Sequence, residues 1–225
     1  MKRRRYVIMA NGRGMRWGNY LGIPKHLISV DDETLIQRIV RQVRERDPKA
    51  DVVISSSDPL LETAGARRHA PERNEIELDR FAPELVNDAV TFLYGDTFYT
   101  AAAMDKIISS TGAPMQFYGD ARSIVAVEVN DGLTMLAHLH NVRSLFLAEE
   151  ISACVGWQVY QSYNQLPFGP PAPHDSLYWL GGLTTGFNTP EDFLRFQDWH
   201  KAHESEESVP GSFPEDPYLT PSTGD

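Results

Sequence analysis

The chain has 225 residues, of which 41% are hydrophobic and 23% charged, a composition typical of a globular protein. Its 31 acidic and 21 basic residues give a formal net charge of −10, which argues against a broad electrostatic grip on nucleic acid. No apolar run approaches the roughly 20 residues that span a bilayer, and the single cysteine, Cys154, excludes an internal disulfide. We therefore expect a cytoplasmic protein that binds neither membrane nor nucleic acid.

The first half of the chain alternates between strand and helix patterns. An apolar run at 6–9 predicts a buried strand, and apolar residues at helical spacing predict a helix over 33–46 with Asp32 as its N-cap. Further strands are expected at 51–55 and 91–94, and a further helix at 100–110, whereas residues 60–80 are polar and irregular. This order predicts a parallel sheet with helical crossovers.

The second half continues the same class of fold. The patterns predict strands at 116–118, 124–129 and 178–180, a helix at 142–155, a Pro- and Gly-rich excursion at 163–173 and a last helix at 189–202. We expect residues 1–202 to form one three-layer α/β/α domain with a mostly parallel, Rossmann-like sheet. Residues 203–225 are acidic and rich in Pro and Ser, so we expect a disordered tail.

A glycine-bearing loop follows the first strand and carries the clearest chemical signal. Its residues are Ala10, Asn11, Gly12, Arg13 and Gly14. Glycines after a strand expose backbone N–H groups that suit a phosphate chain, and Arg16 and Lys25 add compensating charge. The loop is therefore predicted to bind a nucleoside triphosphate.

Two familiar nucleotide loops are excluded by spacing. A dinucleotide fingerprint needs a third glycine three residues after Gly14, where this chain has Trp17. A Walker loop needs Gly-Lys followed by Ser or Thr, and the chain has no such triplet.

Two further sites lie where strands or helices begin or end. Asp96 follows Gly95 at the end of the strand at 91–94, and α/β sheets bind ligands at this end of their strands. Asn188 directly precedes Thr189 and Pro190, which together with Asp192 predict a capped helix start.

The sequence ANGRGMRW, followed by PKHLI, resembles the nucleotidyltransferase signature Leu-Ala-Ala-Gly-x-Gly-Thr-Arg with a later Pro-Lys. That family includes the sugar-phosphate nucleotidylyltransferases and the molybdenum-cofactor guanylyltransferases, which have a GT-A type fold. The matching residues are Gly12, Gly14, Arg16, Pro24 and Lys25. Asn11 replaces the second alanine, and Met15 replaces the usual Thr or Ser.

The resemblance implies a reaction and a role for each site. A phosphorylated acceptor, with a sugar 1-phosphate favoured, would receive NMP from an NTP as pyrophosphate leaves. Residues 10–14 would bind the nucleotide, Arg16 and Lys25 would be catalytic, and Asp96 and Asn188 would bind Mg²⁺. Asn188 supplies only a neutral oxygen, and Gly186 stands where many relatives have an acid.

Two other functions remain open. A GT-A type glycosyltransferase would consume a sugar nucleotide, but such enzymes carry an Asp-x-Asp pair where this chain has only Asp96. A nucleotide-binding module whose site has decayed is suggested by Gly186 and Met15. The residues name neither the base of the NTP nor the acceptor.

Overall fold

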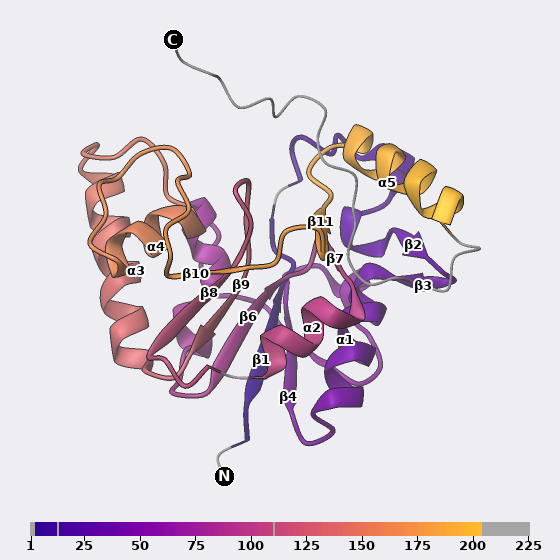
Figure 1. Ribbon diagram of the computed structural model, residues 1–225, viewed down its shortest axis with the longest axis horizontal. Coiled ribbons are helices and arrows are strands. Elements are labelled where there is room, and N and C mark those ends of the chain that lie inside the picture. The colour runs from indigo at the N-terminus through magenta and orange to yellow at the C-terminus, as the bar shows by residue number, and fades with distance from the viewer. Residues whose placement is uncertain (1–2, 13, 110, 204–225) are drawn as a thin grey trace.

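The computed structural model describes residues 3–12, 14–109 and 111–203, which form a seven-stranded sheet with helices on both faces (Figure 1). The strand order is β10-β8-β9-β6-β1-β4-β5, and only the pairs that include β9 are antiparallel. Its strands are β1 (Arg5–Met9), β4 (Asp51–Ser55), β5 (Arg67–His69), β6 (Val90–Tyr94), β8 (Met115–Gly119), β9 (Ile124–Val129) and β10 (Leu177–Trp179). The predicted three-layer fold with a mostly parallel sheet is confirmed.

Strand β1 lies at the centre of the sheet because its residues are apolar on both faces. Val7 pairs with Val53 of β4 on one side and with Phe92 of β6 on the other, and all three are fully buried. Continuous apolar strands of this kind are typical of parallel sheets that are covered on both faces. The carboxyl ends of β1, β4 and β6 therefore meet at one edge, where the glycine loop and Gly95-Asp96 follow.

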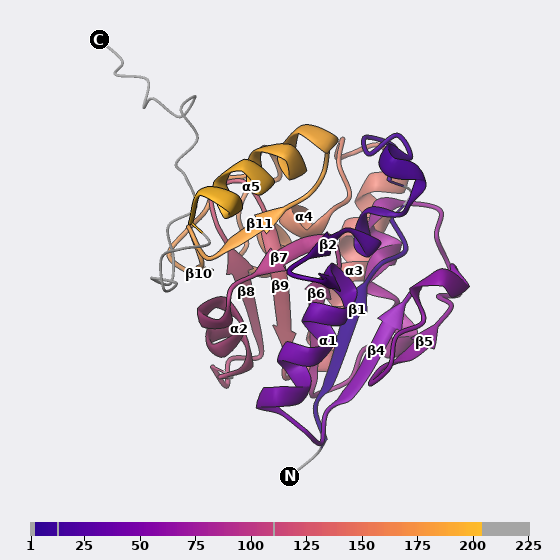
Figure 2. The same ribbon diagram turned by 90° about the vertical axis from the view of Figure 1, so that its right-hand side faces the viewer.

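Four helices cover the sheet in two layers. The helices α1 (Leu35–Arg46) and α2 (Ala101–Ile108) pack on the face of β1 that carries Tyr6 and Ile8. The helices α3 (Gly132–Leu147) and α4 (Gly156–Tyr163) pack on the opposite face. Figure 2 shows the first pair in front of the sheet and the second pair behind it.

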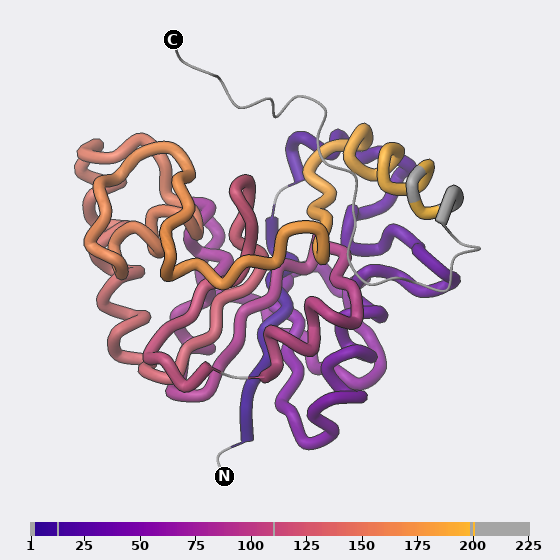
Figure 3. The backbone as a smooth tube through the Cα atoms, viewed as in Figure 1, coloured from indigo at the N-terminus to yellow at the C-terminus, as the bar shows by residue number. Residues whose placement is uncertain are grey.

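A third apolar cluster closes the end of the sheet where the glycine loop lies. Helix α5 (Pro190–His203) contributes Phe193 and Phe196, which pack with Phe98, Phe187 and the loop residue Trp17. Two small antiparallel sheets join this layer: β2 (Ser29–Val30) with β3 (Glu33–Thr34), and β7 (Thr97–Tyr99) with β11 (Thr184–Gly186). Figure 3 shows the chain after β1 and the start of α5 meeting at this end of the sheet.

The predicted N-cap of the first helix is wrong. Thr34 caps α1, with its hydroxyl accepting a hydrogen bond from the Gln37 N–H while the Gln37 side chain accepts one from the Thr34 N–H. Asp31 and Asp32 both have positive φ, of 53° and 63°, and form the turn between β2 and β3. A two-residue hairpin turn of type I′ requires that conformation at both positions, and Asp tolerates it.

The predicted helix at 142–155 is wrong in its bounds. Helix α3 begins at Gly132 and ends at Leu147, and α4 begins only at Gly156. Glu149 has a φ of +58°, and the N–H groups of Glu149 and Glu150 donate to the carbonyls of Phe146 and Leu145. This hydrogen-bond pattern ends helices.

Other differences are smaller. The polar segment 60–80 contains the short edge strand β5, which the sequence did not indicate. Of the predicted tail, only His203 is described, as the last residue of α5, and residues 204–225 lie outside the described part of the chain. None of the described helices is long and apolar enough to cross a membrane.

The Tyr99 side chain forms hydrogen bonds with both the carboxyl end of β6 and the beginning of β9. Its buried hydroxyl accepts a hydrogen bond of 2.9 Å from the Tyr94 N–H and lies 2.6 Å from the Val125 carbonyl oxygen, to which it donates. The last residue pair between β6 and β9 is Leu93 with Ala126. Beyond it, the Tyr99 hydroxyl supplies the hydrogen bonds of the Tyr94 N–H and the Val125 carbonyl.

We predict that Tyr99→Phe lowers the free energy of unfolding by about 1–3 kcal/mol, because it leaves those two backbone groups without a partner. Urea unfolding of the wild type and the variant measures this difference. Tyr178→Phe, on a partly exposed ring, is the matched control. Equal stability of the Tyr99→Phe variant and the wild type would show that water or the neighbouring backbone replaces the hydroxyl.

Candidate active site

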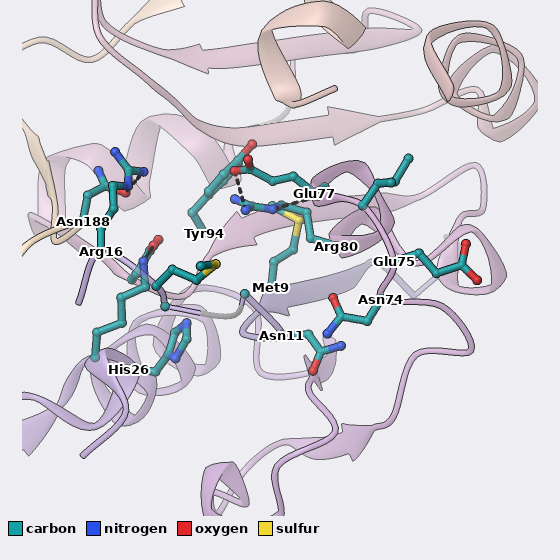
Figure 4. A pocket seen from close by; sticks show the side chains of 16 residues that line it. Met9, Asn11, Arg16, His26, Asn74, Glu75, Glu77, Arg80, Tyr94 and Asn188 are labelled. Carbon is teal, nitrogen blue, oxygen red and sulfur yellow. Dashed lines mark hydrogen bonds and ion pairs between the residues drawn. The ribbon is translucent and has the colours of Figure 1, made fainter. Parts of the chain in front are cut away.

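A cavity of about 280 Å³ lies at the carboxyl edge of β1 and β6 (Figure 4). It is bordered by residues of the glycine loop together with residues far away in sequence. Of the predicted site residues, it brings together Asn11, Gly12, Gly14, Arg16, Lys25, Asp96 and Asn188. Ala10 is buried at the base of the loop and borders an adjoining cavity, while Arg13 lies outside the described residues.

Lys25 and Asp96 form an ion pair in this cavity. Pro24 starts the short 3₁₀ turn Lys25–Leu27, and the Lys25 ammonium donates to the Asp96 carboxylate. Both side chains are largely removed from solvent, with exposures of 11% and 16%. Burial raises the pKa of Asp96, but the charge of Lys25 above all outweighs it, so the pKa lies below its ordinary value. Asp96 is therefore ionised at neutral pH.

Gly95 allows the turn after β6 to touch the end of β1. Its N–H donates to the Met9 carbonyl oxygen at 3.0 Å. A Cβ at this position would lie 2.9 Å from that oxygen and 3.2 Å from the His26 ring, which is too close for a side chain. The glycine before Asp96 is thus required by packing, independently of any ligand.

Asn188 reaches the same place through the small sheet formed by β7 and β11. Gly186 pairs with Thr97, and the Phe187 N–H donates to the Asp96 carbonyl oxygen at 2.8 Å. The Asn188 side-chain oxygen accepts a hydrogen bond of 3.2 Å from Arg16 (Figure 4). Residues 172 positions apart in the chain therefore meet at the mouth of the loop.

The predicted helix start after Asn188 is confirmed. The Asp192 carboxylate accepts hydrogen bonds from the N–H groups of Asn188 and Thr189, at 3.0 and 2.9 Å. The Thr189 hydroxyl accepts one from the Asp192 N–H at 3.3 Å. This capping box fixes the backbone of Asn188 and hence the direction of its side chain.

The glycine loop is held in place by Trp17 rather than by a third glycine. Trp17 is only 3% exposed, its N–H donates to Gly14, and its indole N–H donates to the Ile23 carbonyl at 3.1 Å. Its ring packs edge-on against Phe193 of α5. Gly14 has a φ of +58°, a conformation that favours glycine. The anchored indole thus sets the path of the chain from which Arg16 extends.

A divalent cation fits this site only with help from a substrate. No three His, Cys, Asp or Glu side chains of the described chain are grouped so that they could hold a metal. Asp96 offers one ionised carboxylate and Asn188 one amide oxygen, and both already contact a cationic side chain. Mg²⁺ is commonly bound by one or two carboxylates together with substrate phosphates, so this donor set is compatible with it.

Sequence reasoning missed His26. It is 5% exposed, borders the cavity beside Lys25, and its Nδ1 has no hydrogen-bond partner among the described residues. Burial lowers the pKa of His26 to about 4, so the ring is neutral at pH 7. A single histidine next to Lys25 gave no signal, because its burial depends on the later strand β6.

Arg80 and Tyr94 were missed as well. The Arg80 guanidinium lies 5.6 Å from the centre of the Tyr94 ring, and Glu77 accepts a hydrogen bond from it at 2.6 Å (Figure 4). Burial raises the pKa of Tyr94 to about 12, so its hydroxyl stays protonated. Arg80 comes from the irregular segment 60–80, where no periodic pattern pointed to it.

Comparison with known proteins finds likeness in structure alone. No family model matches the chain, and no curated protein matches its sequence. CTP:phosphocholine cytidylyltransferase from Streptococcus pneumoniae superposes with a TM-score of 0.60 at 11% identity, over 88% of this chain and 99% of that one. The inositol-1-phosphate CTP transferase from T. maritima gives 0.56 at 16% identity, over 90% and 97%.

A UTP-bound UDP-glucose pyrophosphorylase from Acinetobacter baumannii gives a TM-score of 0.59 at 13% identity, over 92% of this chain and 95% of that one. The chain has the nucleotidyltransferase fold. The likeness extends over nearly the whole of each neighbour, so the resemblance inferred from the loop and Pro-Lys is confirmed at the level of the fold. At such low identity, the nucleotidyltransferase fold alone does not assign a substrate.

The buried His26 predicts a pH dependence of stability. The unfolded chain takes up a proton below about pH 6.5, whereas the folded chain resists protonation of His26 down to about pH 4. The stabilisation is therefore complete above about pH 6.5 and is lost as the pH falls toward 4, with about 2 kcal/mol lost by about pH 5.

We predict that His26→Gln removes this part of the pH dependence. Urea unfolding of both proteins at about pH 7.5 and about pH 5 measures it, and the contributions of the other histidines cancel in the difference. His140→Gln, at an exposed position of α3, is the control. If the variant and the wild type lose the same stability on acidification, His26 takes up its proton as readily in the folded chain as in the unfolded one.

Proposed function

We propose that the protein is a magnesium-dependent nucleotidyltransferase. It transfers NMP from an NTP to a phosphorylated acceptor, a sugar 1-phosphate, and releases pyrophosphate. The observation that supports this most directly is the meeting of Arg16, Lys25, Asp96 and Asn188 around the glycine loop, in a cavity at the carboxyl edge of the sheet. Two cations beside a glycine loop after a strand suit a triphosphate.

The structural neighbours support the same class of reaction. Their names join CTP to phosphocholine, CTP to inositol 1-phosphate, and UTP to an enzyme of UDP-glucose. Each pairs a nucleotide with a phosphorylated or sugar compound, and the nucleotide is CTP in two of the names and UTP in the third. We therefore extend the reaction class, and not a particular base, to this chain.

The reaction needs little covalent help from the protein. An oxygen of the acceptor phosphate forms a bond to the α-phosphorus of the NTP, and the bond from that phosphorus to the bridging oxygen of the pyrophosphate breaks. The acceptor phosphate is already ionised at neutral pH, so no general base is required. Positioning and neutralisation of charge supply the rate enhancement.

Each predicted residue has a part in that positioning. The loop N–H groups and Arg16 hold the β- and γ-phosphates, and Lys25 reaches the α-phosphate or the acceptor phosphate. In the structure Arg16 contacts Asn188, and Lys25 contacts Asp96. Asp96, with Asn188, would hold Mg²⁺, which supplies further neutralisation of the phosphates when bound. Substrate phosphates offer Arg16 and Lys25 partners of greater negative charge.

One observation favours a second candidate, a nucleotide-binding module without activity. Asp96 is the one carboxylate among the predicted metal-binding positions, since Asn188 is neutral and Gly186, where many relatives have an acid, has no side chain. Such a module would bind NTP and release no pyrophosphate with any acceptor. A glycosyltransferase, in contrast, would consume a sugar nucleotide without releasing pyrophosphate.

Three substitutions test the proposed roles. We predict that Lys25→Ala and Asp96→Ala each reduce pyrophosphate release by about a hundredfold or more, because each removes a charge at the reacting phosphates. Arg16→Lys fails to a similar degree, since one ammonium does not reproduce the guanidinium fork. Lys49→Ala, on the exposed turn before β4, retains activity. Full activity of the Lys25 or Asp96 variant, with an intact fold by circular dichroism, would contradict the assignment.

A substrate screen tests the reaction itself. Purified protein is incubated with ATP, GTP, CTP, UTP or dTTP and a panel of sugar phosphates, with and without Mg²⁺, and pyrophosphate is measured. We expect release with one nucleotide and one acceptor, and only in the presence of the metal. Pyrophosphate release that persists after chelation of the metal would refute metal dependence. If nucleotides bind but no combination of nucleotide and acceptor releases pyrophosphate, the inactive nucleotide-binding module is favoured.

A further inference from the structure

Asn11 stands where the nucleotidyltransferase signature has its second alanine, and its side chain reaches toward β4. It comes directly after Ala10 at the end of β1, and its Oδ1 accepts a hydrogen bond of 2.9 Å from the Ser57 N–H, after β4. In the sheet, β4 flanks β1 on the side opposite β6. The Asn11 carboxamide therefore lies toward the side away from Asp96 and Lys25.

The contact with Ser57 assigns the oxygen and nitrogen positions of the Asn11 carboxamide. A backbone N–H can only donate, so the atom facing Ser57 is the oxygen and the NH₂ group is at the other end. That nitrogen, Nδ2, is buried and has no hydrogen-bond partner among the described residues. An unpaired buried donor costs about 1–3 kcal/mol, a cost that a ligand with an acceptor atom removes.

Asn11 borders two adjoining cavities. One contains the ion pair of Lys25 and Asp96, and the other, of about 380 Å³, lies on the β4 side. Ser56, Ser57 and Asn74 border the second cavity, and Figure 4 shows the Asn74 carboxamide on the same side of the pocket as that of Asn11. A nucleotide with its phosphates on the glycine loop has room for its base on this side.

We propose that the Asn11 NH₂ group donates a hydrogen bond to a carbonyl oxygen of the nucleobase. The protein then selects an NTP whose base carries a carbonyl (uracil, thymine, cytosine or guanine) and discriminates against ATP. Adenine has no carbonyl oxygen, and its edge acceptors N1 and N7 adjoin the exocyclic amino group, a donor that would face the Asn11 NH₂ group; cytosine, by contrast, offers its carbonyl oxygen away from its amino group. The inference rests on the proposed function for the presence of an NTP, and it concerns a side chain that the signature's alanine does not supply.

Two variants separate the donor from the structural contact. Asn11→Asp keeps an oxygen for the Ser57 N–H and replaces the NH₂ donor with an acceptor, whereas Asn11→Ala removes both. Asn141→Ala is the matched control, because Asn141 lies exposed on α3, where its amide donates to Ser162.

Isothermal titration calorimetry without acceptor measures the binding of UTP, CTP, GTP, dTTP and ATP to each protein. We expect one carbonyl-bearing NTP to bind the wild type at least about tenfold tighter than ATP. Both Asn11 variants lose about ten- to a hundredfold of affinity for that nucleotide, Asn11→Asp the more because its carboxylate also repels the triphosphate, while the ATP affinity of Asn11→Ala changes by less than about threefold. Asn141→Ala binds like the wild type.

Tightest binding of ATP, or an equal loss for all nucleotides in the Asn11→Ala variant, would overturn the inference. Unchanged affinity in both variants would overturn it too. Because no acceptor is present, the result is independent of turnover. If nucleotide affinity depends on Asn11 as expected but the screen shows no pyrophosphate release, only the proposed reaction is refuted. If no NTP binds, both the proposed reaction and the role of Asn11 are refuted.

Discussion

Charge neutralisation at the carboxyl edge of the sheet is the constraint on which the rest of the site depends. The Lys25 ammonium and the Asp96 carboxylate are both largely shielded from water, and either one alone would cost several kcal/mol in that position. The segment after Pro24 must therefore touch the turn after β6. Gly95 makes this contact possible, since a side chain there would collide with the Met9 carbonyl and His26. The packing of the backbone and the chemistry of the site are thus a single requirement.

The hydrogen bond from Arg16 to Asn188 depends on residues that have no chemical role in the site. Trp17 is buried against Phe193 and directs the chain that carries Arg16, while the capping box at Thr189 and Asp192 directs Asn188. Trp17 belongs to the aromatic layer that α5 places over the end of the sheet, and the capping box stands at the start of α5 itself. Rigid support of this kind holds a site within the narrow tolerances that group transfer needs. The layer therefore pre-forms the mouth of the loop before any ligand binds.

The central strands, most helices and the main site residues were predictable because their signals are local. The apolar runs of β1 and β6, the spacing of Gly12, Gly14 and Lys25, and the position of Asp96 can all be read from short stretches. The end of α3 before Glu149 was not, because a left-handed residue other than glycine leaves no mark in composition. Strands β7 and β11 form only with each other, and the burial of His26 depends on Gly95, so both follow from contacts between distant segments.

The reversed direction of β9 decides where the molecule is free to vary. Strand β9 runs antiparallel to both β6 and β8, so the turn between Gly119 and Ile124 lies at the same edge of the sheet as Asp96. A parallel strand in this place would instead need a crossover connection from this edge to the opposite edge of the sheet. Residues inserted in that turn would lengthen a loop at the edge of the site without shifting the register of β1, β4 or β6. Recognition on that flank can therefore diverge by changes in loop length, while the strands that hold the glycine loop stay as they are.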